Sequence, residues 1–313
     1  MKVKHLTLTA ASLCLLVPLA GHAARADATK YEVWLTDQTN SKGLSLSTPN
    51  GTHGGFIRVY SGADLEAKPP INNPLNLDVS DLFPNALAGT GSNLMRVHGA
   101  LPSPNMKYMA AALVASGHVA IIDGATKRPK ALFRTTGTPT GRQNHMGFWT
   151  ADGKHLILAN QNGRLLERID YNSRSDKFTF NAAATLDLVG GTGRITAQPV
   201  ADPSLPGGRV SGTVADGQST VTPNGVPKQG GAAPNDRPNN SVICPIVSND
   251  NVHAYVTLAG GGMFVVDVTT TPMSIVAEYG ASAVPAAGCG GEQRLSRHRR
   301  LHRSGADVQE GRA

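Results

Sequence analysis

A gapless internal repeat constrains this chain more than any other feature of its sequence. Residues 98–123 and 145–170 align from a histidine to an aspartate, and the two units begin 47 residues apart, at positions 98 and 145. Each unit runs through a turn into an apolar strand, then through a second turn into another strand that ends on the aspartate. A supersecondary unit of this length, repeated along the chain, must bury its apolar faces against its own copies.

Two further copies of the same unit are present. A third copy and a weaker fourth follow the same order of strand and turn, at residues 242–250, 253–258, 262–267 and 274–279, and at residues 31–34 and 55–60. In the fourth copy, residues 55–60 align with the third strand of the unit. A period of 40–50 residues with four short strands is typical of a β-propeller blade. We therefore expect an all-β fold built from four-stranded blades.

The first 26 residues read as a targeting segment. Lys2 and Lys4 precede the apolar residues 6–19, and Ala24-Arg25-Ala26 resembles a cleavage site, so we predict a secretory signal and a periplasmic or secreted protein. No later apolar run approaches the eighteen residues of a membrane-spanning helix, and we expect no transmembrane segment. Residues 27–291 are expected to form one propeller domain.

Two segments interrupt this pattern. Residues 190–239 are rich in Gly, Pro, Ser, Thr and Asn, which predicts a loop insertion that is either functional or, as its composition favours, disordered. Residues 292–313 hold six arginines and no apolar periodicity. They are either a basic arm or, as we favour, an abnormal or frameshifted end, which would leave the last blade incomplete and one sheet edge open.

The net charge of +7 does not predict a nucleic-acid partner. Lys2, Lys4 and Arg25 leave with the signal, and residues 292–313 carry a further net +3, so subtracting three and three leaves about +1 for the propeller domain. An exported protein has little access to nucleic acid. We expect either a protein partner or a small molecule.

The turn and strand sequences of the blades carry a resemblance to a known group. Ser103-Pro-Asn-Met-Lys107, Thr150-Ala-Asp-Gly-Lys154 and the run Gly-Gly-Met-Phe-Val-Val that ends at Asp267 resemble secreted propellers of the broad lactonase-like and YVTN-repeat group. The resemblance implies a seven-bladed ring, truncated here if the chain is abnormal after Gly291. The group includes lactone hydrolases, surface-layer repeats, copper oxidoreductases and partner-binding scaffolds, so it does not fix a function.

Three residues occupy the same place in successive blades. His98, His145 and Cys244 stand where the innermost strand begins, so they are expected to converge beside the central channel, where imidazole and thiolate could bind copper or another divalent metal such as zinc. The resemblance to periplasmic copper propellers implies the same use of ring histidines. Alternatively, the histidines bond the backbone of a neighbouring blade, and Cys244 forms a disulfide with Cys289, which we favour for the cysteines.

Other polar residues are weaker candidates. Arg96 and Arg142 shortly precede the two histidines and could bind an anionic ligand, although pairing with a blade carboxylate is the simpler expectation. His53 lies between glycines, in a ligand-binding loop or a plain turn. His118 and His253 are expected at the surface or in blade packing, and Asp123, Asp170 and Asp267 are expected to cap turns.

No complete catalytic set emerges from these residues. The leading hypothesis is an exported β-propeller scaffold that binds a partner or small ligand through its faces or central channel. The first alternative is a periplasmic copper-dependent oxidoreductase that uses the channel histidines. The second is a lactonase-like hydrolase.

Overall fold

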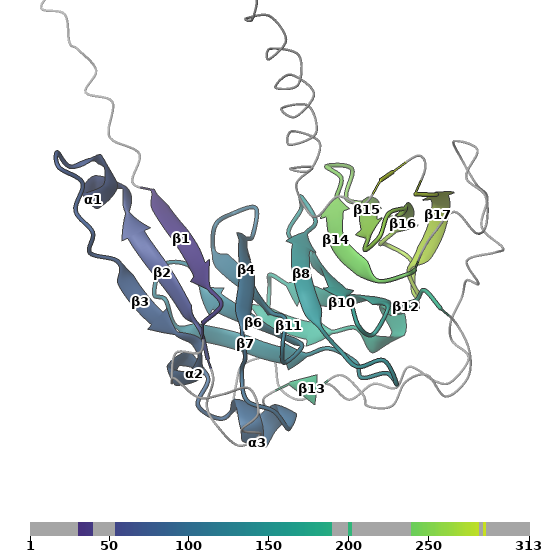
Figure 1. Ribbon diagram of the computed structural model, residues 1–313, viewed down its shortest axis with the longest axis horizontal. Helices are drawn as coiled ribbons and strands as arrows, with labels where there is room; N and C mark the ends of the chain where they lie inside the picture. The colour runs from purple at the N-terminus through teal and green to yellow at the C-terminus, as the bar shows by residue number, and fades with distance from the viewer. Residues whose placement is uncertain (1–30, 40–53, 190–199, 202–238, 282–283, 286–313) are drawn as a thin grey trace, which may run out of the picture.

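The computed structural model describes residues 31–39, 54–189, 200–201, 239–281 and 284–285, and these form four antiparallel sheets (Figure 1). His53, Cys289, most of the predicted insertion, the predicted signal and residues 292–313 lie outside the described residues. Within the described part, no helix is long and apolar enough to cross a membrane. The domain boundaries of the sequence analysis remain predictions.

The first sheet has the strand order β1-β2-β3 and is followed by short helices. Its elements are β1 (Glu32–Asp37), β2 (Phe56–Ser61), α1 (Gly62–Glu66), β3 (Leu75–Asp78), α2 (Val79–Leu82) and α3 (Ala86–Thr90). The helix α1 begins where the Ser61 hydroxyl accepts a hydrogen bond from the amide of Asp64, an ordinary N-cap.

The second and third sheets are the two units of the gapless repeat. The second comprises β4 (Val97–Pro102), β5 (Tyr108–Leu113), β6 (His118–Asp123), β7 (Pro129–Arg134) and β13 (Val200–Ala201). The third comprises β8 (Asn144–Trp149), β9 (His155–Asn160), β10 (Leu165–Asn172), β11 (Lys177–Phe180) and β12 (Leu186–Asp187), with a 3-10 turn at Ala182–Ala184. The strand β13 lies within the predicted insertion, and its backbone extends the outer edge of the second sheet at β7.

The fourth sheet is a four-stranded meander. Its strands are β14 (Val242–Val247), β15 (His253–Leu258), β16 (Met263–Asp267) and β17 (Ser274–Tyr279), in that order. The sequence predicted the second and fourth of these strands with the same bounds. Each expected copy of the repeat is therefore one sheet, as the blade interpretation requires.

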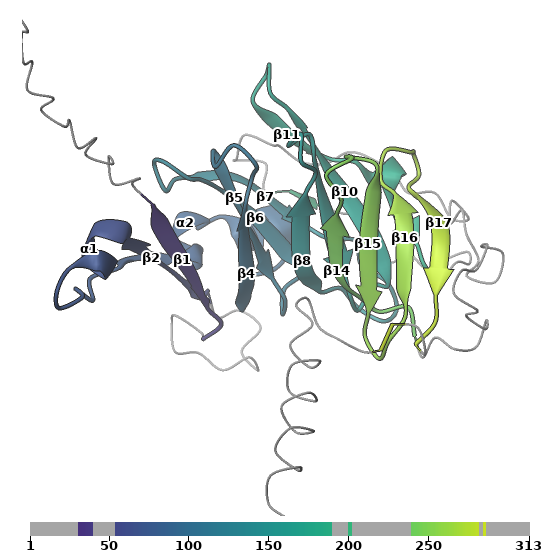
Figure 2. The same cartoon turned by 90° about the horizontal axis from the view of Figure 1, so that it is seen from above.

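The core lies between the sheets, which are stacked face to face (Figure 2). Three apolar clusters separate first sheet from second, second from third and third from fourth. The strand β9 shows why alternation matters: Ile157 and Ala159 pack toward the fourth sheet, whereas Leu156 and Leu158 pack toward the second. Both faces of a middle blade are buried, which explains the nearly continuous apolar sequence of its strands.

The strands β4, β8 and β14 run parallel to one another on neighbouring blades (Figure 1). His98 and His145 meet near the starts of β4 and β8, and the indole nitrogen of Trp149 donates to the carbonyl oxygen of Leu101 near their ends, at 3.3 Å. His145 contacts the Ile243 carbonyl oxygen near the start of β14. This parallel row of inner strands is the propeller arrangement that the repeat predicted.

The strand β1 runs in the opposite direction to β4. Glu32, at its start, pairs with Lys127 beside the hairpin that follows β4, whereas Thr36, near its end, donates to the carbonyl oxygen of His98 at 2.8 Å. Second strands run antiparallel to first strands in the other sheets. The direction of β1 is thus that of a second strand, and β2 takes the place of a third strand, as the sequence predicted for residues 55–60.

Candidate functional site

His98 and His145 converge between the second and third blades. Their ring centroids are 4.6 Å apart, with an angle of 56° between the ring planes. The two side chains come from the second residues of β4 and β8, which are 47 positions apart in the sequence. The predicted convergence of the two histidines is therefore confirmed.

A backbone irregularity recurs where these residues lie. The pairing register shifts between Val97 and Gly99 in β4, between Asn144 and Gly147 in β8, and between Val242 and Pro245 in β14. Such bulges change the direction of a side chain and are frequent beside functional sites. Each shift spans one candidate residue: His98, His145 or Cys244.

Gly99 permits the close approach of the two inner strands at this point. A Cβ atom on Gly99 would lie 2.5 Å from the sulfur of Met146, the residue that follows His145. A larger residue at position 99 would require the Met146 side chain to move.

Hydrogen bonds define the protonated nitrogen of each ring. The Nδ1 of His145 lies 3.1 Å from the carbonyl oxygen of Ile243, and since a carbonyl can only accept, Nδ1 carries the proton and Nε2 is bare. The amide nitrogen of Gln38 contacts Nδ1 of His98, so this Nδ1 accepts and the proton is on Nε2. Among the described residues neither Nε2 has a hydrogen-bond partner.

Both rings are uncharged near neutral pH. Burial lowers the pKa of His98. Burial also lowers the pKa of His145, and the neighbouring His98 lowers it further, while the bond to the Ile243 carbonyl opposes these effects. The site therefore presents one free imidazole acceptor, His145 Nε2, close to one free imidazole donor, His98 Nε2–H.

The third predicted ligand lies apart from this pair. Cys244 is fully buried in β14, directly after Ile243, and its backbone amide donates to the Thr257 hydroxyl at 3.3 Å. In the described ranges, no three His, Cys, Asp or Glu side chains gather into a group that could hold a metal. Because Cys289 lies outside these ranges, the Cys244–Cys289 disulfide stays a prediction, as does the metal site.

A surface hollow of about 600 Å³ reaches the histidine pair through Gln38, and neither imidazole is among its lining residues. It is lined by Asp37, Gln38, Thr39 and Arg96, and Gln38 is the residue that contacts His98. The carboxylate of Asp37 is paired with Arg58 at 3.1 Å and also accepts hydrogen bonds from Thr39, whose hydroxyl and amide, with Arg58, lower the pKa of Asp37. Arg96 is exposed and forms no ion pair with a described residue.

Arg142 is committed to the contact between blades. Its guanidinium donates to the Thr135 carbonyl oxygen at 2.6 Å, and burial lowers its pKa while the charge of Glu167 opposes that shift. Glu167 is fully buried, accepts from the amide of Thr136 and the side chain of Asn160, and has a pKa raised by burial to about 7. Of the two predicted anion-binding arginines, Arg96 therefore lines the hollow, whereas Arg142 helps to close the blade interface.

Two other histidines among the described residues have structural partners. His118 is fully buried, with Nδ1 bonded to Ser116 and Nε2 to Thr90, at 2.8 and 2.7 Å. This confirms its predicted role in blade packing. His253 bonds to Asp250 beside its own hairpin turn.

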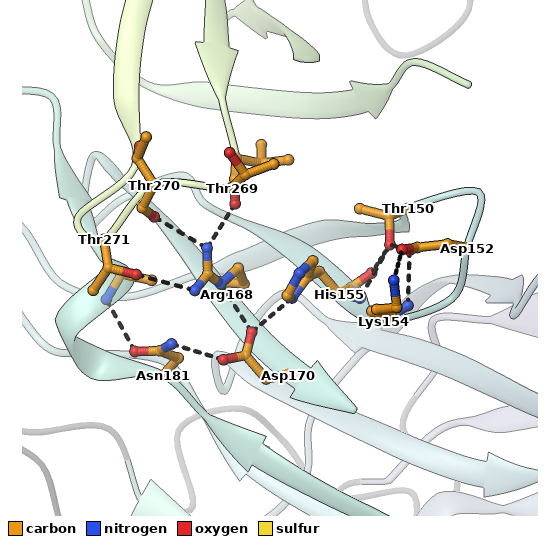
Figure 3. A network of polar contacts seen from close by, with 12 residues as sticks. Thr150, Asp152, Lys154, His155, Arg168, Asp170, Asn181, Thr269, Thr270 and Thr271 are labelled. Carbon is orange, nitrogen blue, oxygen red and sulfur yellow. Dashed lines mark hydrogen bonds and ion pairs between the residues drawn. The ribbon is translucent and has the colours of Figure 1, made fainter. Parts of the chain in front are cut away.

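The three strand-ending aspartates do not share one role. The carboxylates of Asp123 and Asp267 accept from backbone amides of the following turn, as predicted. Asp170 instead bonds to His155, Arg168 and Asn181 in a network between the third and fourth blades (Figure 3). The capping prediction is wrong for Asp170 because β10 continues to Asn172, whose side chain accepts from the backbone amides of the following turn instead.

The sequence analysis missed Gln38, Thr36 and the Ile243 carbonyl. Thr36 and Gln38 follow residues 31–34 of the weak fourth copy of the repeat. That copy has no residue that aligns with His98. The Ile243 carbonyl is a backbone group and leaves no residue signal. Its position directly before Cys244 was the one sequence feature that could have indicated it.

Comparisons with known proteins show similarity in structure alone. No family model matches the chain, and no curated protein matches it. The Cps50 (Swd1) β-propeller domain of Myceliophteria thermophila matches with a TM-score of 0.36 and 11% identity, over 75% of this chain and 54% of that one. Further structures are a 6-phosphogluconolactonase-like protein from Bacteroides uniformis (TM-score 0.39, 9% identity, 80% and 68% covered) and the periplasmic gluconolactonase PpgL of Pseudomonas aeruginosa (0.38, 14%, 80% and 54%).

The chain spans about half to two thirds of the length of these structures. All three are β-propellers or lactonase-like proteins by name.

Proposed function

We propose that this protein is an exported propeller scaffold that binds a small hydroxy acid at the channel end of β4 and β8. The observation that carries the proposal is the pair of imidazoles whose centroids lie 4.6 Å apart, each held through Nδ1. A ligand hydroxyl both donates and accepts, so it matches a free donor on His98 and a free acceptor on His145. His98 and His145 keep these donor and acceptor roles only while both rings are neutral, because a protonated imidazole donates from both nitrogens.

Arg96 provides the second proposed contact with the ligand, to its carboxylate. It lines the hollow that also contains Gln38, the partner of His98. Asp37, the carboxylate in the same lining, is already paired with Arg58, so the hollow retains one uncommitted positive charge among its described lining residues. A carboxylate on the ligand would pair with Arg96 while its hydroxyl bonds the imidazoles.

Gluconate and sorbitol provide a matched test, because they share a polyol chain and differ in the carboxylate. Isothermal titration of the mature protein should give saturable binding of gluconate and much weaker binding of sorbitol. His98→Ala and His145→Ala should each weaken gluconate binding about tenfold, the loss of roughly one hydrogen bond. Arg96→Met should weaken it similarly, whereas Arg128→Met, an exposed arginine at the other end of the blade, should not.

Equal binding of gluconate and sorbitol would contradict the role of Arg96. Binding that survives both histidine substitutions would contradict the site itself. Hydrolysis of gluconolactone that is lost in His98→Ala would replace the scaffold with the lactonase-like alternative.

One specific observation favours the copper oxidoreductase as a second candidate. The bond from His145 Nδ1 to a backbone carbonyl leaves Nε2 bare, which is the usual preparation of a histidine metal ligand. Copper bound there would supply one-electron chemistry, with His98 as a second ligand after rotation of the Gln38 amide. His53, which lies outside the described residues, would have to complete the set.

Elemental analysis beside a thiol count tests this candidate. Near-stoichiometric copper that is lost in His98→Ala, with titratable thiols in the unfolded chain, would support it. Absence of metal together with absence of free thiol would indicate the Cys244–Cys289 disulfide and leave the hydroxy-acid site.

A further inference from the structure

A second hollow lies at the opposite end of the inner strands from the histidine pair. It has a volume of about 340 Å³ and is formed between the hairpins that follow β4 and β8. Its lining residues are Ser103, Pro104, Asn105, Tyr108, Trp149, Ala151, Asp152, Gly153, Lys154, Tyr171 and Ser173. Neither the repeat nor the proposed hydroxy-acid site uses this hollow.

Its aromatic side is held rigidly. The indole nitrogen of Trp149 donates to the Leu101 carbonyl oxygen, and the hydroxyls of Tyr108 and Tyr171 both bond to Asp176. Tyr108 and Tyr171 pack edge to face, with centroids 5.6 Å apart. Tyr108 is 2% exposed and Trp149 9% exposed, so the apolar surface of the hollow comes mainly from Tyr171 and Pro104, with the edge of Trp149. Groups held in fixed positions can bind an apolar ring face with little loss of side-chain entropy.

The two charged residues in the lining of this hollow neutralise each other, since Lys154 pairs with Asp152 at 2.8 Å on the rim. Outside the lining, Lys107 and Lys130 share Asp176, which leaves one net positive charge behind the tyrosines. An ionic ligand would therefore find no uncommitted counter-charge among the described lining residues. A neutral ligand fits this environment better.

Hydrogen-bonding groups remain available on the rim. The side-chain oxygen of Asn105 accepts from the Ser103 hydroxyl and the Lys107 amide, so its orientation is fixed, while its amide nitrogen has no partner among the described residues. Ser173 is exposed at the same rim. The amide of Asp152 is bonded to Asn251 of the fourth blade, which fixes the second hairpin.

We infer that this hollow binds a neutral pyranose ring. A pyranose combines apolar C–H faces, which suit Trp149, Tyr171 and Pro104, with peripheral hydroxyls, which suit Asn105, Ser173 and the Asp152–Lys154 pair. Small-molecule sites combine an aromatic lining with a few placed polar groups in this way. The volume is sufficient for a single sugar unit.

Tryptophan fluorescence provides a direct readout, because the chain has two tryptophans and one of them lines the hollow. In Trp34→Phe, titration with methyl glucopyranoside, galactopyranoside and N-acetylglucosaminide should give a saturable change in Trp149 emission for at least one sugar, with a dissociation constant in the millimolar range. Asn105→Asp keeps the oxygen that orders the hairpin and removes the amide donor, so it should weaken that binding about tenfold.

Two controls separate this site from the first. Asn162→Ala, at an exposed turn on the other end of the third blade, should leave sugar binding unchanged. His98→Ala and His145→Ala should also leave it unchanged, while each weakens gluconate binding about tenfold. Absence of a saturable response to all three sugars, or a response that Asn105→Asp does not alter, would overturn the inference, and saturation by a proline-rich peptide alone would replace it.

Discussion

The histidine pair between the second and third blades differs from the Arg168 network between the third and fourth. In the network, Arg168 is 4% exposed and donates to the carbonyl oxygens of Val268 and Thr270, to the Thr271 hydroxyl and to Asp170 (Figure 3). In the pair, each imidazole uses Nδ1, and the described residues leave Nε2 open. Both lie between neighbouring blades, but one is saturated with protein partners and the other is not.

This difference distinguishes a structural polar cluster from a binding site. Buried polar groups are costly unless they are satisfied, so a network whose groups all have partners serves the stability of the blade interface. Open donor and acceptor atoms at a bulge, beside a hollow, are instead available to a ligand. Substitutions in the two places should therefore separate effects on stability from effects on binding.

The largest expected effect is on the Arg168 network. Arg168→Met should lower the free energy of unfolding by about 3 kcal/mol, because it leaves the carbonyl oxygens of Val268 and Thr270 without their donor at a buried interface and removes one of the three partners of Asp170. Urea denaturation would measure the loss. Arg174→Met, which removes an exposed arginine from the following turn, should change stability by less than about 0.5 kcal/mol. An equal loss in both variants would contradict the structural role.

The second effect depends on pH and tests Glu167, at the edge of the histidine interface. Its pKa is about 7 in the folded protein, above the ordinary value of 4.5, so the folded state holds a proton that the unfolded state loses. This contribution to stability is fully present below about pH 4.5 and is lost as the pH rises through about 7. Arg142, the nearest charged side chain, limits the loss.

Glu167→Gln cannot ionise and should remove this dependence. The free energy of unfolding of the variant, minus that of the wild type, should rise by on the order of 3 kcal/mol from about pH 4 to about pH 8. Denaturation at both pH values would measure it. Glu66→Gln, at an exposed glutamate, should give a nearly flat difference, and a flat difference for Glu167→Gln would show that folding does not shift the pKa of this carboxyl.

His118 sharpens the comparison because it is a histidine with both nitrogens bonded. His118→Ala should cost about 2 kcal/mol, since Ser116 and Thr90 lose their buried partner. Gluconate affinity should be unchanged once the variant is folded. A larger effect on binding than on stability would mean that His118 belongs to the ligand site.

The smallest effect on stability should come from His145. His145→Ala removes a partly exposed ring with one hydrogen bond and should cost less than about 1 kcal/mol, although it weakens gluconate binding about tenfold. Thermal unfolding would measure the loss of stability, and isothermal titration calorimetry would measure the loss of gluconate affinity. Loss of folding in this variant would place His145 with the structural histidines.

The repeat alone predicted much of this structure. The strands of three blades, the third-strand position of residues 55–60 and the convergence of His98 on His145 follow from aligned positions, since equivalent residues of adjacent blades must meet at the inner end. Gln38 could not be predicted, because it follows β1, whose own repeat is weak. The burial of Arg142 could not be predicted either, because it depends on contacts with Gly117, Thr135 and Glu167.

Nitrogen NMR of the two histidines, with and without gluconate, tests the central claim most directly. The account predicts that His145 carries its proton on Nδ1 and His98 on Nε2, that both titrate below their ordinary pKa, and that gluconate shifts both Nε2 resonances. Histidines that titrate at or above pH 6.5, or Nε2 resonances that gluconate leaves unmoved, would contradict it.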